Sequence, residues 1–453
     1  MRNSRAESRR GLSPASVLDL AVLLTALVVV RCVMLFALGG LCDASEFTDD
    51  WNWHIAVSER PLMLIQGETL SHGQHPTLLP IILSPFLRAW RSLLADFYAV
   101  RATWISFEVL ALFLVWWSAL YHLGRRMRIL TFAMWIASPV AWMTTVVMAQ
   151  DEIVAAAWLA AVLLLLTRKR FALAIGVCAL GVAAAKIYLA LPLLALIVCL
   201  RSPSFFRRLG LGVALAGGPY VVSALLAVAG NNPLPLVGFW PAAPFGVNAW
   251  ALVSTAMAPA IAGALSGALV ICALTGIALY SRTIHAPPQL LAIRTSEAML
   301  CASFWLFYHV NPEYYVLPAM LIALRLRSLR AAIAYHCALS LFWFVNFFYG
   351  VACYTRTGTG SGKQPFVALY GALFAFPPEA LHKVSLVAAV FCGAALVYMS
   401  LRGMAYAAAG PLSHSTSTSY PDAPEASGIS KSVTCRGRSN IISSDDTRQE
   451  RPN

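Results

Sequence analysis

The sequence predicts an all-α protein, a polytopic bundle of about 12 transmembrane helices with a short interfacial or re-entrant helix in its first outer loop. Of the 453 residues, 59% are hydrophobic and 12% are charged, whereas about 25% of an average soluble domain is charged. Apolar runs near the roughly 20 residues that cross a bilayer recur between residues 17 and 402. Helices are expected because lipid offers no partner for backbone N–H and C=O groups.

The chain divides into a basic cytosolic N-terminus (1–16), a transmembrane domain (17–404) and a tail (405–453) that we expect to be disordered in the cytosol, because it is rich in Ser, Thr, Pro and charged residues. The first apolar run is too long for the core of a signal peptide, so we interpret it as a retained helix. The predicted spans are 17–40, 98–123, 129–148, a fourth ending before Arg168, two short helices in 171–200, 209–229, 260–280, 290–308, 316–324, 332–353 and 384–401.

The first outer loop covers residues 41–97 and contains the short apolar segment 76–90, which is interrupted by Pro80 and Pro85 and closed by Arg88 and Arg91. If this segment lies at the interface, Lys and Arg gather at the inner ends of the other spans, as the positive-inside rule requires. The net charge of +13 therefore indicates topology rather than nucleic-acid binding. The ten cysteines include no CxxC pair, so neither a zinc site nor a disulfide framework is indicated.

Two clusters of acidic residues fall on the predicted outer face. Asp49 and Asp50 lie among tryptophans and precede His54, so one carboxylate could act as a general base in a partly desolvated site. Gln150, Asp151 and Glu152 form the second cluster, in the turn between the third and fourth spans. The simpler alternatives are a solvated acidic loop and favourable acids at a helix N-terminus.

Two further features carry polar groups into apolar sequence. Lys186 interrupts a long apolar stretch, and a charge there is costly in lipid and functional by default, unless the lysine only reaches water by snorkelling. His309 could hydrogen-bond a phosphate, and Glu313 and Tyr314 follow it, where Glu313 could orient the histidine or hold a sugar hydroxyl. The alternative for this segment is an interfacial aromatic belt.

The order of these features resembles the C-type integral-membrane glycosyltransferases, and most closely the bacterial polyprenyl-phosphate-mannose-dependent mannosyltransferases. The resemblance covers residues 17–402 and rests on a first helix, an acidic outer loop, a Gln-Asp turn, a small-residue helix ending in Lys186 and a late aromatic and histidine turn. Residues 74–77 depart from the family's Tyr-Pro-Pro-like turn, because the tyrosine is missing.

The resemblance implies an inverting transfer of a hexose, mannose by analogy, from a polyprenyl-phosphate donor to a lipid or glycan acceptor at the outer face of a bacterial plasma membrane. Asp50, or Asp49, would be the base, and Lys186 and His309 would bind the donor phosphate. The remaining polar residues of the clusters would bind substrate: His54, Gln150, Asp151, Glu152, Glu313 and Tyr314. No metal or cofactor is implied, and the expected partners are these substrates and membrane lipids.

Two other functions fit the sequence. A transporter or flippase of a lipid-linked saccharide predicts polar residues on both sides of the midplane and internal repeats, whereas this chain has no clear repeat and one-sided polar clusters. A polymerase or ligase of surface polysaccharide would need its dominant outer loop late in the chain, where 354–381 is the one available segment.

Overall fold

The computed structural model describes residues 14–37, 48–66, 76–119, 123–200, 205–231, 249–252, 259–308, 310, 312–323, 329–330, 333–341 and 378–408, with backbone alone at 48–53, 251–252, 259–260, 312, 378–386, 388–389 and 406–408. Contacts divide the chain into the units Met1–Gly410 and Pro411–Asn453. The predicted tail (405–453) therefore lies outside the described residues, apart from the helical residues that end at Ala408.

Every regular element among the described residues is a helix, which confirms the all-α prediction. The elements are α2 (Pro14–Ala37), α4 (Thr48–Glu59), α5 (Leu79–Arg91), α6 (Asp96–Ala119), α7 (Arg125–Ala137), α8 (Pro139–Trp142), the π-helix η1 (Met143–Val147), α9 (Glu152–Thr167), α10 (Phe171–Ala184), η2 (Ile187–Leu189), α11 (Ala190–Cys199), α12 (Phe205–Ala229), η3 (Ala249–Leu252), α13 (Pro259–Thr283), α14 (Pro288–Leu306), η5 (Pro312–Tyr315), α15 (Val316–Ala323) and α18 (Pro378–Ala408).

The predicted count of about 12 spans is not confirmed. Among the described residues, four helices are long and apolar enough to cross a membrane: α2, α6, α12 and the 261–283 part of α13. A fifth arises if α7 and the following α8–η1 segment, which are bent by 50° at Pro139, form one broken span. Several other apolar segments fold as helices of 10–17 residues, shorter than the roughly 20 residues that a perpendicular crossing needs.

Individual segments agree with the predictions in several places. The first apolar run forms α2, and residues 171–200 form two short helical pieces that meet at Lys186. The apolar part of the first outer loop forms α5, with Pro85 inside the helix. The polar part of that loop differs from expectation, because it contains the helix α4.

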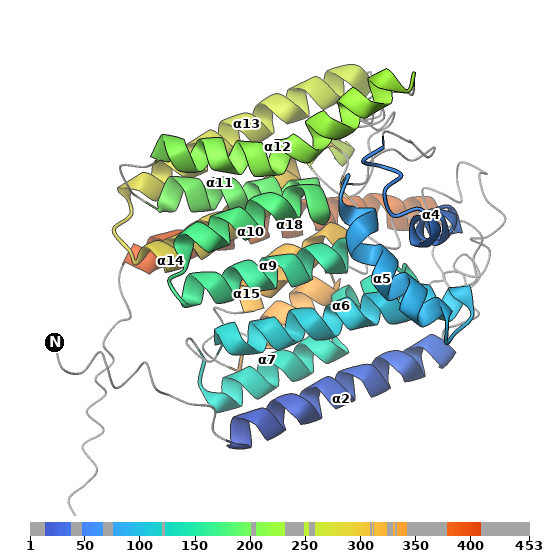
Figure 1. Cartoon of the computed structure of the whole chain (residues 1–453). Helices are drawn as coiled ribbons and strands as arrows, with labels where there is room; N and C mark the ends of the chain where they lie inside the picture. Colours follow the sequence, from blue (N-terminus) through green and yellow to red (C-terminus); the bar gives the residue numbers. More distant parts are fainter. Residues whose placement is uncertain are drawn as a thin grey trace, which may run out of the picture. The chain divides into compact units, whose positions relative to one another are not determined.

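The helices pack side by side, and those with neighbours on several sides are buried inside the bundle. Helix α6 packs on α2, α7 and α9, α10 on α9 and α12, and α14 on α11, α13 and α18. In Figure 1 these helices run roughly parallel or antiparallel, and α4 and α5 cross near one end. Helix α6 is consequently enclosed, with 67% of its most apolar window buried, against 17% for α12.

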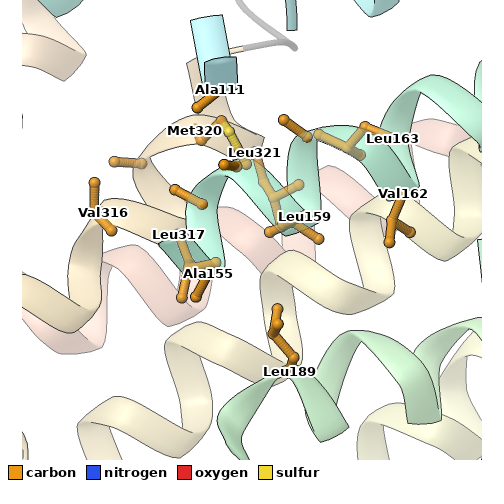
Figure 2. Close-up of a cluster of buried hydrophobic side chains, with 14 of the residues drawn as sticks. Ala111, Ala155, Leu159, Val162, Leu163, Leu189, Val316, Leu317, Met320 and Leu321 are labelled. Atoms are coloured by element: carbon orange, nitrogen blue, oxygen red, sulfur yellow. The ribbon is translucent and has the colours of Figure 1, made fainter. Parts of the chain in front are cut away.

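The interior of the unit Met1–Gly410 contains one large apolar core. Figure 2 shows part of it, where α15 lies against α9. The labelled side chains of these two helices are Ala155, Leu159, Val162, Leu163, Val316, Leu317, Met320 and Leu321. These aliphatic side chains pack α9 against α15, and the N-terminus of α9 carries the acidic pair described next.

Candidate functional site

The acidic turn follows a distorted helical segment. After the bend at Ser138 and Pro139, the chain passes through the π-helix η1 and reaches Ala149, which has a left-handed φ of 51°. The Gln150 N–H then donates to the Thr144 carbonyl at 2.9 Å. This reversal makes Asp151 the N-cap of α9 and Glu152 its first residue.

Lys186 lies in a second interruption of the helical backbone. Helix α10 ends at Ala184, Lys186 is extended (φ −154°, ψ 141°), and η2 begins at the next residue. Two carbonyls near the end of α10 find partners elsewhere: Leu78 N–H donates to the Ala183 carbonyl at 2.8 Å, and the Tyr220 hydroxyl donates to the Val182 carbonyl at 3.0 Å. The interruption is therefore supported from both sides by α12 and by the start of α5.

The two interruptions bring opposite charges together. Lys186 Nζ lies 2.6 Å from Asp151 Oδ1 and 2.8 Å from Glu152 Oε1. The side chains are 14%, 2% and 1% exposed, respectively. Two carboxylates face one ammonium, so the ion cluster of Asp151, Glu152 and Lys186 has a formal charge of −1. Among the described residues, no three His, Cys, Asp or Glu side chains are grouped as a metal ion would require.

Aromatic rings from η2, η5 and α14 pack together beside this cluster. The Tyr188 ring centroid lies 5.1 Å from that of Tyr314 and 5.7 Å from that of Phe304. The Tyr188 hydroxyl and Glu152 Oε2 are buried and have no hydrogen-bond partner within the described part of the chain. Since buried polar atoms are normally paired, these two atoms are available to a bound hydroxyl group or water.

The structure brings together Asp151, Glu152, Lys186 and Tyr314 from the predicted set. Glu313 is 2% exposed, precedes Tyr314 in η5 and interacts electrostatically with Tyr188. Gln150 adjoins the cluster in sequence, and its side chain donates to the Met148 carbonyl at 3.2 Å.

The remaining predicted residues are placed elsewhere or lie outside the described parts. His54 of α4 packs edge-on against Trp104 of α6, with ring centroids 4.9 Å apart, so it belongs to the interface between these helices. The backbone of Asp49 and Asp50 lies in the first turn of α4, and their side chains are outside the described residues, as is the whole of His309.

An open pocket of about 500 Å³ lies where α4, α5 and α6 meet. Arg88 of α5 donates from Nε to the Ser58 carbonyl at 2.5 Å, and Arg91 donates from Nε to Asp96 Oδ1 at 2.7 Å. The hydrogen bond to Asp96 raises the pKa of Arg91 against the opposing effect of partial burial. These contacts hold α5 against the end of α4 and the start of α6. Arg88 and Arg91 therefore stabilise the packing of these three helices.

Sequence reasoning missed two features. Tyr188 was overlooked, although an aromatic residue two positions after Lys186 would have been a signal. Arg31 and Glu108 were also overlooked, although each interrupts an apolar run and both are fully buried. An ionisable residue inside an apolar span is a recognised signal of a specific partner.

No known protein family matches the chain, and no curated protein is significantly similar to it.

Proposed function

We propose that this protein is a multi-pass membrane glycosyltransferase that moves a hexose, by analogy mannose, from a polyprenyl-phosphate donor to a lipid or glycan acceptor. We place it in a bacterial plasma membrane with the site facing outward. The observation that carries the proposal is the buried ion cluster of Asp151, Glu152 and Lys186 beside the rings of Tyr188 and Tyr314. Sugar hydroxyls donate hydrogen bonds to carboxylates, and the apolar face of a sugar packs on aromatic rings.

The ion cluster suggests how its members would divide their roles. Lys186 has three N–H donors and directs them at two carboxylates, which leaves one for a donor phosphate. Because carboxylate oxygens accept hydrogen bonds from hydroxyl groups, we assign Asp151 and Glu152 to sugar hydroxyls, with Glu152 Oε2 as the atom that has no partner among the described residues. His309 is the second proposed phosphate ligand.

Asp50, with Asp49 as its alternative, is the proposed general base. Both lie in the first turn of α4, where the positive end of the helix dipole favours an ionised carboxylate. The base would take the proton from the acceptor hydroxyl as its oxygen attacks the anomeric carbon, and the polyprenyl phosphate would leave from the opposite side with inversion. His54 lies in the same helix, and its packing on Trp104 holds α4 against α6.

The experiment compares Asp49→Asn, Asp50→Asn and the double variant in purified protein, with polyprenyl-phosphate hexoses as donors. Loss of a general base is expected to lower kcat by about 10²- to 10⁴-fold, with little change in KM for the donor. Asp19→Asn is the control, because Asp19 near the start of α2 pairs with Arg125 at the start of α7 and belongs to neither α4 nor the ion cluster. Full activity in all three acidic-loop variants would end the base assignment.

A transporter of lipid-linked saccharides is the second candidate, and the interrupted helix at Lys186 favours it. Interrupted helices often line transport sites, because their free backbone groups bind ions and substrates. The two functions separate in reconstituted vesicles. Movement of a labelled lipid-linked sugar across the membrane without a new glycosidic product supports the transporter, whereas product formation supports the transferase.

A further inference from the structure

Two buried polar atoms beside the ion cluster are chemically complementary but do not bond to each other. Glu152 Oε2 accepts hydrogen bonds, the Tyr188 hydroxyl donates and accepts them, and the two side chains interact electrostatically. Each of these atoms is buried and lacks a hydrogen-bond partner within the part of the chain that the structure describes. Because unpaired buried polar atoms are costly, the pair calls for a bound group that both donates and accepts.

The Glu152 carboxylate is fixed in position by its helix and by its ion pair. Glu152 is the first residue of α9, and the turn before it is closed by the Val154 N–H, which donates to the Asp151 carbonyl at 2.9 Å. Lys186 Nζ lies 2.8 Å from Oε1, and the Glu152 side chain is 1% exposed. The ion pair therefore occupies one carboxylate oxygen, and Oε2 can accept a hydrogen bond from a ligand while that pair stays intact.

The Tyr188 ring is fixed by the short helix η2 and by two aromatic neighbours. The Leu189 N–H donates to the Lys186 carbonyl at 3.1 Å, and Leu189 is fully buried, so it anchors η2 in the core. The Phe304 ring packs almost perpendicular to the Tyr188 ring, with centroids 5.7 Å apart, and the Tyr314 ring lies 5.1 Å away. A ring packed in this way presents its hydroxyl in a pre-organised position.

We infer that Tyr188 is a specificity-determining residue, and that its hydroxyl and Glu152 Oε2 bind the same hydroxyl group of the sugar. The sugar hydroxyl donates to Glu152 Oε2, and its oxygen accepts from the Tyr188 O–H, so both unpaired atoms gain a partner. A sugar without this hydroxyl leaves both atoms buried and unpaired, and such a site discriminates against the deoxy analogue. The inference rests on the proposed function for its ligand, the hexose of a polyprenyl-phosphate donor.

The experiment measures binding separately from transfer. The full-length protein, purified in detergent, is titrated calorimetrically with polyprenyl-phosphate mannose and with its monodeoxy analogues, each of which lacks a different sugar hydroxyl. We expect one analogue to bind roughly 10- to 100-fold more weakly than the parent donor, because its binding leaves a buried carboxylate oxygen and a phenol unpaired. Tyr188→Phe should weaken binding of the parent donor about fivefold and should change binding of that analogue less than about twofold.

Thermal unfolding of the ligand-free protein distinguishes a ligand contact from a structural role. Because the Tyr188 hydroxyl has no partner among the described residues, Tyr188→Phe should not lower the unfolding temperature. Tyr220→Phe is the matched control, since the Tyr220 hydroxyl donates to the Val182 carbonyl at 3.0 Å. It should lower the unfolding temperature and leave the ratio of the dissociation constants of the parent donor and its analogues unchanged.

The inference fails if every analogue binds as tightly as the parent donor, if the parent donor does not bind, or if Tyr188→Phe weakens the parent donor and the weakest analogue equally. A loss of stability in Tyr188→Phe as large as that in Tyr220→Phe would also overturn it. Product formation tests the proposed function separately. A glycosidic product without the expected change in discrimination rejects the inference alone, whereas the expected discrimination without a product supports the inference and rejects sugar transfer.

Discussion

Arg31 and Glu108 form a buried ion pair that joins three helices. Arg31 Nη2 lies 2.7 Å from Glu108 Oε1, Arg31 Nη1 donates to the Ile136 carbonyl at 2.8 Å, and the Trp135 indole N–H donates to Glu108 Oε1 at 3.2 Å. Both charged side chains are fully buried. A bidentate arginine and carboxylate pair with such additional partners offsets much of the cost of removing the charges from water.

Arg31→Met is therefore expected to destabilise the protein by about 3–5 kcal/mol, because Glu108 is left buried without a counter-charge. Thermal unfolding of the detergent-solubilised protein measures this loss. The double variant Arg31→Met with Glu108→Leu should recover much of it, since no uncompensated charge remains. If the double variant were no more stable than the single one, the pair would not act as an electrostatic unit.

Replacing Lys186 should lower the stability of the protein about as much as replacing Arg31, independently of the role of Lys186 in binding. Lys186→Met leaves Asp151 and Glu152 side by side, almost completely buried and without a counter-charge, so we expect a loss of about 3–5 kcal/mol. The triple variant that adds Asp151→Asn and Glu152→Gln should be more stable than Lys186→Met alone. Unfolding temperatures of these variants and of Arg170→Met, which removes an exposed charge, test this, and equal losses for Lys186→Met and Arg170→Met would contradict it.

At the scale of elements, α9 and α10 pack closely because Gly181 leaves room for a tryptophan. The Trp158 ring of α9 occupies the position that a Cβ at Gly181 would take, and its indole N–H donates to the Val177 carbonyl at 2.5 Å. The close approach carries Lys186, at the end of α10, towards the acidic turn at the start of α9.

Gly181→Ala should consequently destabilise the protein by about 1–3 kcal/mol through overpacking, although alanine is the better helix former. Gly217→Ala in α12 is the matched control, because an added Cβ there meets nothing within 4 Å, and it should be neutral or stabilising. Thermal unfolding measures both variants. Equal effects would show that the helix contact is less tight than described.

At the scale of the whole unit Met1–Gly410, the ion cluster and Arg168 mark opposite ends of α9. Helix α9, with 16 residues, is about 24 Å long, with the ion cluster at its start and Arg168 following its end. Arg101 of α6 donates from Nε to the Val146 carbonyl, just before the acidic turn. The N-terminal end of α6, and with it Ser92, therefore lies at the end that carries the ion cluster.

This arrangement predicts that Ser92 and Arg168 lie on opposite sides of the membrane. In a background without the ten native cysteines, Ser92→Cys should react with a membrane-impermeant maleimide in intact cells, and Arg168→Cys should react after lysis only. Both native residues are exposed, so accessibility to the reagent is not limiting. Labelling of both positions from the same side would contradict the proposed topology.

The amino-acid sequence alone predicts the helical fold and the position of some residues of the candidate site. The apolar runs predict helices, and the charge of Lys186 within such a run marks the interruption that the structure contains between α10 and η2. Gln150, Asp151 and Glu152 were likewise expected at a turn, and this is where the chain reverses before α9. These are local properties, because hydrophobic composition and a single charge or turn determine them without reference to distant residues.

Which helices pack against one another, and which ionisable residues form pairs, is determined by the tertiary structure. Helices α2, α6 and α12 are each long and apolar enough to cross a membrane, yet α6 is enclosed and α12 is largely uncovered. A helix that is apolar all round has no polar face to indicate which side packs on which partner. For this reason the sequence by itself determined an all-helical chain with polar interruptions, whereas only packing paired Lys186 with both Asp151 and Glu152, and Arg31 with Glu108.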